Sequence, residues 1–301
     1  MMKMLLRCWL AGTFLALAGG QAMADDDDDS DRSEWSTPEP VENVAGGCPI
    51  ENRSGRTLYT AGGFDGTLDI WTYTRKGKKA PFGPREKVGP PVSLDDTNDF
   101  CPTPLVGGWL LFVSDRGGDD TCGNADMYIT RYRPGSGAHW DEARNLGCAP
   151  HGPNTDGREL SPALFSTSEG VFLYYSTNGP GGDQDIYRSR MGWNGQFGPG
   201  EPVDELNTAF NDQQPNVGRG GREIVFSSDR AGAGQDVFSA SREDTDDAWS
   251  TPRNLSVELA FPTGNGSETR ASLSWDLKRL YYGSAGTIYV AKRKPGRNND
   301  D

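Results

Sequence analysis

Residues 222–238 read REIVFSSDRAGAGQDVF, and residues 109–128 read WLLFVSDRGGDDTCGNADMY. Both stretches place an apolar run before Ser-Asp-Arg, then a glycine-rich gap, and then Asp with an apolar and an aromatic residue. Short apolar runs bounded by Gly, Asp and Asn are typical of short β-strands joined by turns. The sequence therefore contains the same strand–turn–strand unit at least twice.

A common frame relates five copies of this unit. In four copies, nine residues separate a proline or alanine from an apolar residue of the next strand: Pro49 and Leu58, Pro102 and Leu111, Pro215 and Ile224, Ala271 and Leu280. In the remaining copy, Pro162 and Leu173 are eleven residues apart, which indicates a two-residue insertion.

Each copy continues beyond this pair of strands. The third segments are LDIWTYTR, ADMYITRY, QDIYRSR, QDVFSASR and GTIYVAKR, and the first four copies add a fourth, such as HWDEARNLG or WSTPRNLS. Four strands in about 50 residues, repeated along the chain, are the pattern of a β-propeller. The sequence predicts an all-β, five-bladed β-propeller with four antiparallel strands per blade.

The fifth copy ends at Arg293 without a fourth segment of its own. The stretch WSTPEPVENV, which begins at Trp35, matches WSTPRNLSVE, which begins at Trp249. The N-terminal strand is therefore expected to complete the last blade, because an unclosed ring would leave open strand edges. This predicts a single propeller domain over residues 35–293.

The repeats can be compared with a known family. FSSDRAGAGQDVF and RASLSWDLKRLYYGS resemble the repeats of TolB-like propellers, a WD-type repeat family common in exported bacterial proteins. The resemblance spans the mature chain. It implies a β-propeller, in a family that includes binding scaffolds and a few lyases.

Both ends of the chain differ from the repeats. Residues 1–24 hold basic Lys3 and Arg7, an apolar stretch and a final Ala-Met-Ala, which predicts a signal peptide cleaved near Ala24 and a periplasmic or secreted protein. Residues 25–34 form an acidic leader and residues 294–301 a tail, and both are expected to be disordered. No later segment approaches the roughly 20 apolar residues of a membrane span.

The charge and the histidine content exclude several classes of function. The formal net charge is −13, and it falls to −15 when the signal peptide removes Lys3 and Arg7. Such an acidic chain is a poor binder of nucleic acid and of anionic membranes. The two histidines, His139 and His151, lack metal-ligand spacing, which disfavours zinc chemistry and a Ser-His-Asp triad.

Four cysteines remain after the signal peptide: Cys48, Cys101, Cys122 and Cys148. An even number in an exported protein predicts two disulfides, with three possible connectivities. Cys48 and Cys101 share one register in adjacent blades, and Cys122 and Cys148 lie on neighbouring loops. The favoured pairing is therefore Cys48–Cys101 with Cys122–Cys148.

The aspartates of the repeated motif are expected to be structural. One blade position holds Asp69, Asp126, Asp185 and Asp236, with Thr287 in the fifth copy. Asp side chains commonly bond nearby backbone N–H groups in turns. The arginines of the two Ser-Asp-Arg sequences are expected to tie their loop to the Asp that follows.

A second repeated position is the candidate site. Three residues before the proline or alanine of each frame stand Gly46, Asp99, Glu159, Asp212 and Glu268. These carboxylates are expected to ring one mouth of the central channel, where crowding would raise some pKa values. They could bind a cation, act on carbohydrate as a pair of carboxyl groups, or bond to a neighbouring blade and to the preceding turn.

Two further loops carry aspartates that do not follow the repeat. LDDTNDFC and GGDDTC place Asp95, Asp96, Asp119 and Asp120 on the face where the cysteines also lie. Carboxylate oxygens are suitable ligands for calcium, so these four residues are a candidate Ca²⁺ site.

Three functions stay open. The leading one is a monomeric, exported, non-catalytic propeller that binds a protein or an envelope polysaccharide or peptidoglycan component through the acidic, cysteine-bearing face. The second is a carbohydrate-active enzyme, hydrolase or lyase, that uses the channel-mouth carboxylates. The third is a calcium-dependent binding module.

Overall fold

The computed structural model describes residues 34–295, except 136, 138, 180, 181, 233 and 263–267. The predicted signal peptide lies outside the described residues, as do all but one residue of the leader and most of the tail. Within the described part, the only α-helix is α1 (Leu255–Glu258), and no helix is long and apolar enough to cross a bilayer. A short 3-10 turn, η2 (Val106–Gly108), precedes one strand.

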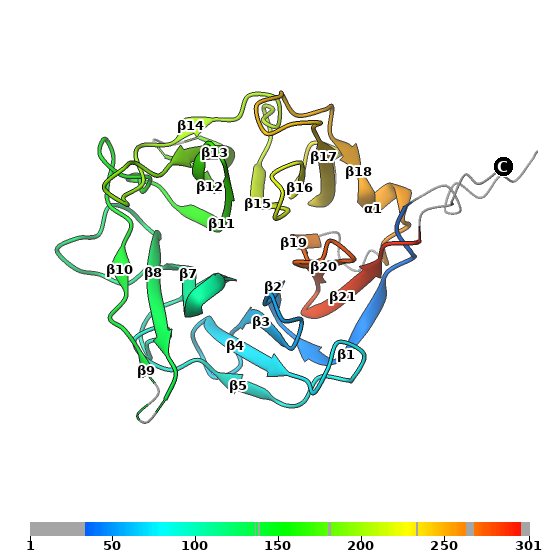
Figure 1. The fold of residues 1–301 in the computed structure, drawn as a ribbon, viewed down its shortest axis with the longest axis horizontal. Helices are drawn as coiled ribbons and strands as arrows, with labels where there is room; N and C mark the ends of the chain where they lie inside the picture. Colours follow the sequence, from blue (N-terminus) through cyan, green and yellow to red (C-terminus); the bar gives the residue numbers. More distant parts are fainter. Residues whose placement is uncertain are drawn as a thin grey trace, which may run out of the picture.

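The repeat folds into the predicted all-β propeller of five antiparallel sheets (Figure 1). Blade 1 holds β2 (Gly47–Glu51), β3 (Thr57–Gly62), β4 (Asp69–Thr74) and β5 (Arg85–Lys87). Blade 2 holds β6 (Asp99–Pro104), β7 (Trp109–Ser114), β8 (Asp126–Arg133) and β10 (Arg144–Asn145), with β9 (His139–Trp140) also paired to β8. Blade 3 holds β11 (Glu159–Thr167), β12 (Gly170–Thr177), β13 (Asp185–Arg190) and β14 (Glu201–Pro202).

Blade 4 holds β15 (Asp212–Val217), β16 (Glu223–Ser228), β17 (Asp236–Ser241) and β18 (Arg253–Asn254). Blade 5 holds β19 (Glu268–Leu273), β20 (Arg279–Ser284), β21 (Thr287–Lys292) and β1 (Glu39–Ala45). Strands β2, β11, β15 and β19 lie nearest the centre of the ring in Figure 1.

The N-terminal strand closes the ring, as predicted. β1 pairs antiparallel with β21, and an isolated bridge joins Trp35 to Arg293. The Trp35 side chain is 1% exposed, and the Arg293 guanidinium lies 4.4 Å from the centre of its ring. The first and last strands of the propeller are therefore joined by both backbone pairing and a buried aromatic contact.

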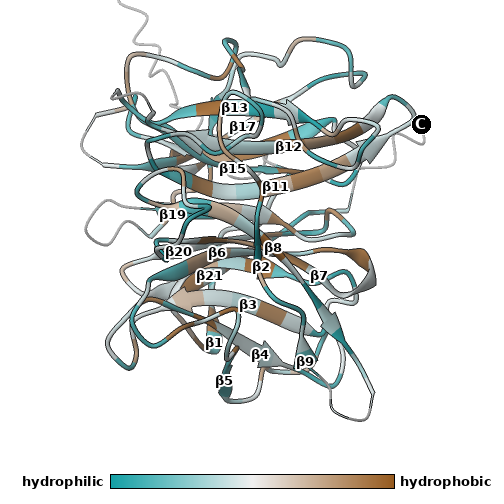
Figure 2. Ribbon diagram, turned by 90° about the vertical axis from the view of Figure 1, so that its left-hand side faces the viewer, coloured by the Kyte–Doolittle hydropathy of each residue, from teal (hydrophilic) through white to brown (hydrophobic). Residues whose placement is uncertain are grey.

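Apolar side chains fill the space between the strands. Most residues of the middle strands β3, β7, β12, β16 and β20 are buried, and the others are half-buried. Figure 2 shows hydrophobic residues concentrated in strands such as β7 and β11, whereas many of the loops are hydrophilic. The alternation of apolar and polar residues within the repeat thus places a hydrophobic layer on each blade, which neighbouring blades cover.

Each inner strand also contains the same irregularity. Its register against the second strand shifts, and one residue at the shift has a left-handed backbone: Cys48 (φ 47), Cys101 (φ 49), Ser161 (φ 51), Gln214 (φ 57) and Arg270 (φ 33). Such β-bulges redirect a side chain locally.

Several of these five residues contact one another around the ring. Cys48 and Cys101 form a disulfide, and Ser161 Oγ lies 3.2 Å from Cys101 Sγ. The backbone N–H of Arg270 donates to Gln214 Oε1 at 2.7 Å. These contacts link the bulge residues of blades 1, 2 and 3 with one another and those of blades 4 and 5 with each other, and we call the five residues the axial ring.

Candidate functional site

The predicted carboxylates stand at the first residues of four inner strands. In each, the backbone N–H donates to a carbonyl of the preceding blade: Asp99 to Leu68 (2.7 Å), Glu159 to Ala125 (2.9 Å), Asp212 to Gln184 (2.6 Å) and Glu268 to Gln235 (3.0 Å). Gly46 makes the corresponding bond to Gly286 at 3.0 Å and so joins blade 1 to blade 5. This position therefore links each blade to its neighbour.

The carboxylates are enclosed in these junctions. Asp99, Glu159, Asp212 and Glu268 are each 0% exposed. Three of them accept a hydroxyl bond from a threonine of the preceding turn: Asp99 from Thr97 (2.8 Å), Glu159 from Thr155 (2.6 Å) and Asp212 from Thr208 (2.7 Å). Of the possibilities that the sequence left open for these acids, the structure shows bonds to the preceding turn. At Asp99, Glu159 and Asp212 this turn folds back over the acid and encloses it between blades.

Two of the four carboxylates form ion pairs with the arginines of the Ser-Asp-Arg motif. Arg116 Nη2 donates to Asp99 Oδ1 at 2.7 Å, and Arg230 donates in the same way to Asp212. Each arginine thus bonds to the acid that starts its own blade and not, as we expected, to the Asp that follows it.

The aspartate of the motif has its own partner. Asp115 accepts bonds from the backbone and side-chain nitrogens of Asn98, both at 2.7 Å, and Asp229 accepts the same two bonds from Asn211, both at 2.9 Å. In blades 2 and 4, the Asn-Asp pair at the start of the inner strand is therefore hydrogen-bonded to the Asp-Arg pair that follows the second strand. These hydrogen bonds explain why the Ser-Asp-Arg motif occurs in both blades.

Glu159 lacks such an arginine. Its Oε1 accepts three bonds, from the N–H and hydroxyl of Thr155 and from the hydroxyl of Thr177, while its Oε2 has no hydrogen-bond partner among the described residues. Burial raises the pKa of Glu159 to about 7, and the nearby charge of Asp126 contributes in the same direction. The site therefore favours a protonated carboxyl group near neutral pH.

Glu268 is the second carboxyl group without an arginine. Its Oε2 lies 3.4 Å from Ser256 Oγ, and its Oε1 has no hydrogen-bond partner in the part of the chain that the structure describes. Burial raises the pKa of Glu268, and so does the nearby carboxylate of Asp236. Blades 3 and 5 thus differ chemically from blades 2 and 4.

The register of the inner hairpins explains this difference. Asp99, Glu159, Asp212 and Glu268 pair with Ser114, Thr177, Ser228 and Ser284. Two residues after each pairing partner stand Arg116, Gly179, Arg230 and Gly286. Aspartate therefore occurs with arginine, and glutamate with glycine. This combination of residue types is visible in the sequence, although our sequence analysis did not use it.

The four loop aspartates are not gathered into a metal site. Asp95, Asp96, Asp119 and Asp120 are all exposed, and Asp95 lies 4.0 Å from the ammonium group of Lys87. Among the described residues, no group of three or more His, Cys, Asp or Glu side chains could hold a metal ion.

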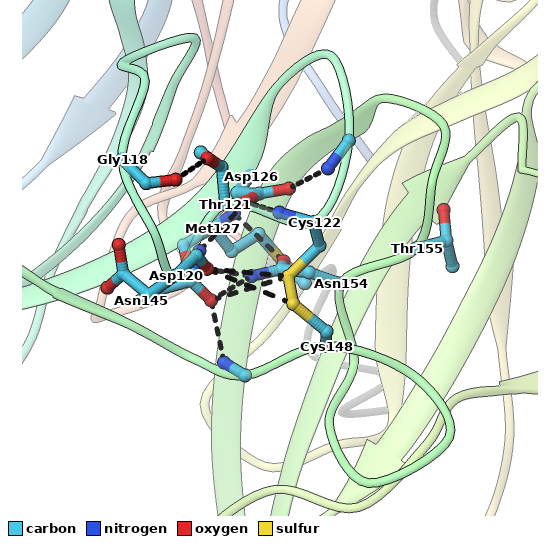
Figure 3. The surroundings of a disulfide bond; sticks show 12 residues. Gly118, Asp120, Thr121, Cys122, Asp126, Met127, Asn145, Cys148, Asn154 and Thr155 are labelled. Carbon is cyan, nitrogen blue, oxygen red and sulfur yellow. Dashed lines mark hydrogen bonds between the residues drawn. A yellow bond between two sulfur atoms is a disulfide. The ribbon is translucent and has the colours of Figure 1, made fainter.

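The cysteines pair as predicted. Cys48 joins Cys101 with their Cα atoms 5.1 Å apart, and Cys122 joins Cys148 with their Cα atoms 5.3 Å apart. Figure 3 shows the second disulfide beside Asp126, whose carboxylate accepts bonds from the Cys122 and Gly123 N–H groups. This disulfide therefore holds the loop that supplies two donors to Asp126.

No protein-family model matches the chain, and no curated protein matches it. Solved structures do. An α-L-arabinofuranosidase from Lactobacillus brevis is 14% identical, with a TM-score of 0.54, over 84% of this chain and 92% of its own. An endo-arabinase from Bacteroides thetaiotaomicron VPI-5482 is 12% identical, with a TM-score of 0.53, over 88% of this chain and 98% of its own. TolB from Acinetobacter baumannii is 15% identical, with a TM-score of 0.44, over 82% of this chain and 54% of its own.

At these identities the likeness shows the fold alone. It nevertheless corrects our leading interpretation of a non-catalytic binding propeller. Several of the solved propellers that this chain resembles are arabinofuranosidases and other glycoside hydrolases. The carbohydrate-active alternative agrees better with these neighbours.

Proposed function

We propose that the protein is a carbohydrate-active enzyme that cleaves a glycosidic bond, with Glu159 as its proton donor. The observation that carries this proposal is the state of Glu159, a buried carboxyl group with one oxygen fixed by three donors and the other without a partner. The fold that the chain shares with the arabinofuranosidases supports it, as an analogy of fold.

The chemistry of glycoside cleavage explains why this state is useful. Protonation of the leaving oxygen requires a carboxyl group that keeps its proton near the working pH. Burial supplies that condition at Glu159, whose pKa is raised to about 7. The three bonds to Oε1 would orient the group so that the proton on Oε2 is the one donated.

A second carboxyl group is needed as base or nucleophile, and Asp126 is the candidate. Its charge acts on Glu159, and two backbone N–H groups and the Asn145 amide donate to its oxygens. These donors stabilise an ionised carboxylate, although burial raises the pKa of Asp126. Unlike environments of this kind separate the acid from the base in a catalytic pair.

Access to Glu159 requires a local movement. The side chain is 0% exposed, and the turn that carries Thr155 folds over it. That turn packs against the next loop closely, since a Cβ atom added at Gly157 would lie 2.5 Å from the Gly179 nitrogen. A substrate would have to displace this turn to reach Oε2.

The test is hydrolysis of a panel of 4-nitrophenyl glycosides and of soluble polysaccharides, with arabinofuranosides and arabinan included, by wild-type protein and by Glu159→Gln. We expect cleavage by the wild type and its loss in Glu159→Gln, since the amide cannot supply the proton. The matched control is Glu268→Gln, which changes the corresponding residue of blade 5 and should retain activity. Absence of cleavage across the panel would contradict the enzymatic function, and loss only in Glu268→Gln would contradict the role of Glu159.

We also propose that the chain is exported and processed near Ala24, that residues 35–293 form one domain, and that its repeats are of the TolB-like type. The two disulfides support export, because such bonds persist in oxidising compartments. Mass spectrometry of the mature protein, recovered from the periplasm and from the medium, tests this. A mature N-terminus at Met1 would contradict it.

A further inference from the structure

One member of the axial ring is a buried cation without a carboxylate. Arg270 is 0% exposed, and its guanidinium donates only to uncharged oxygens, at 3.0 Å to Pro102 O and at 2.6 Å to Thr103 Oγ1. Its Nε has no hydrogen-bond partner, and Arg270 forms no ion pair within the described ranges. The charge of this side chain is thus uncompensated.

Other largely buried arginines of the propeller do have carboxylate partners. Arg116 pairs with Asp99, Arg230 pairs with Asp212, and both Arg75 and Arg279 pair with Glu51. Removing a charge from water is unfavourable unless an opposite charge compensates it. Burial accordingly lowers the pKa of Arg270 to about 9. This exception indicates that an anion from outside the chain completes the site.

A cavity lies at one end of the channel, and Arg270 is separated from it by its hydrogen-bond partner Thr103, which lines the cavity. Arg270 occupies the same ring position as Cys101, but its guanidinium bonds to Pro102 and Thr103, further along β6. Thr103 lines a cavity of about 290 Å³ formed by the last residues of the inner strands from all five blades. The carboxylates of the proposed active site stand at the opposite ends of these strands, so the two sites are separate.

The lining of this cavity fits an anion with an apolar face. Two exposed arginines, Arg53 and Arg219, stand in its wall, and neither forms an ion pair within the part of the chain that the structure describes. The one carboxylate of the lining, Glu51, is already paired twice. Trp109 and Trp275 supply aromatic surface, and each already has an arginine over one part of its ring, Arg131 at 5.3 Å and Arg53 at 5.0 Å. The wall is therefore cationic, although the chain as a whole carries a formal charge of −13.

We propose that this cavity binds a small organic monocarboxylate built on one ring, such as a sugar acid or an aromatic acid. The carboxylate would lie at the Thr103 end, where the charge of Arg270 acts on it from behind Thr103. Arg53 and Arg219 would attract it, and the ring would lie against the tryptophans. The volume matches a ligand of about one ring, since sites for drug-sized molecules begin at about 300 Å³. This site does not depend on the proposed glycoside cleavage.

The test is calorimetric titration of the mature protein with two matched pairs, benzoate against benzamide and glucuronate against glucose. We expect at least one carboxylate to bind about tenfold more tightly than its neutral partner. Arg270→Gln should abolish this preference and still fold, because Gln214 occupies the corresponding position of blade 4 with the same left-handed backbone (φ 57). Arg219→Ala, at the exposed rim, should weaken binding severalfold without a change in melting temperature.

Three outcomes would overturn the site. The first is that neither carboxylate binds more tightly than its neutral partner, and the second is that chloride competes as well as the carboxylates do. The third is that Arg270→Gln and Arg219→Ala bind both carboxylates as the wild type does. The first and third would show that Arg270 serves only to pack the channel, and the second would show a site for any small anion and not for an organic carboxylate. Failure here leaves the glycoside assay unaffected, because that assay reads the residues at the other end of the inner strands.

Discussion

Replacement of Glu159 by glutamine should change how the stability of the protein depends on pH. The pKa of Glu159 is raised to about 7 in the folded protein, from the ordinary value of 4.5. The folded state therefore keeps a proton that the unfolded state loses between these two values. The stability contributed by the neutral group is fully present below about pH 4.5, falls as pH rises, and is lost above about pH 7.

The size of this effect follows from the two pKa values. At about 1.4 kcal/mol for each pH unit, the difference corresponds to about 3 kcal/mol in the free energy of unfolding. Glu159→Gln cannot ionise, so it should lack this loss and gain about 3 kcal/mol on the wild type between pH 4.5 and pH 8. For a domain of this size that is a relative rise of about 6–12 °C in melting temperature.

Thermal and urea unfolding of the two proteins, measured in parallel across this pH range, provides the assay. Other buried acids, including Glu268 and Asp126, also titrate and add to the slope of the wild type. The contribution of acids that do not interact with Glu159 cancels in the difference between the two proteins, whereas that of Asp126 cancels only in part, because its charge acts on Glu159. Parallel profiles would refute the reasoning, and a variant that becomes relatively less stable at alkaline pH would show that Glu159 is ionised in the folded state.

Three further perturbations address other parts of the propeller. Asp212→Asn should lower the free energy of unfolding by about 3 kcal/mol at pH 8, the opposite sign to Glu159→Gln, because it leaves Arg230 buried without its partner; urea unfolding checks this, and an unchanged midpoint would contradict it. The double substitution of Cys122 and Cys148 by alanine should cost about 2–4 kcal/mol, measured in the same way, and no loss would show that the loop is held by its hydrogen bonds alone. Trp35→Ala should cost about 3–5 kcal/mol, because it empties the buried contact that closes the ring; a melting temperature equal to that of the wild type would mean that β1 pairing alone suffices.

The fold was predictable because the spacing of the sequence repeat indicates the number of blades and the strands within each blade. The spacing from Pro49 to Leu58 recurs along the chain, and the match between the stretches at Trp35 and Trp249 placed the closing strand correctly. The disulfide between Cys48 and Cys101 followed from their shared register. These features depend on the position of a residue within its blade, and the periodicity of the sequence gives that position.

The environment of the candidate site was only partly predictable. The carboxylates stand at the first residues of the inner strands, and at three of them burial depends on how the preceding turn folds back, as at Thr155 over Glu159. The exchange of arginine for glycine at Gly179 was readable from the sequence once the hairpin register was known. The position of the residue was therefore available from the repeat, whereas its ionisation state required the contacts.

The channel could not have been inferred from the repeat. Arg270 departs from its counterparts in the other blades, and its guanidinium bonds to residues 167 and 168 positions away in the sequence. Contacts across the axis of a ring join blades that are distant along the chain, and no local pattern encodes them. The cavity beside Arg270 likewise takes its wall from all five blades.

The most direct measurement of the central claim is the titration of Glu159 itself. Protein labelled with ¹³C at glutamate carboxyl carbons, compared with labelled Glu159→Gln to assign the signal, gives the protonation state of this group at each pH. The account predicts a carboxyl group that titrates with a midpoint near 7. A midpoint at or below the ordinary value of 4.5 would contradict it, because Glu159 would then be an ionised structural residue with no proton to donate at neutral pH.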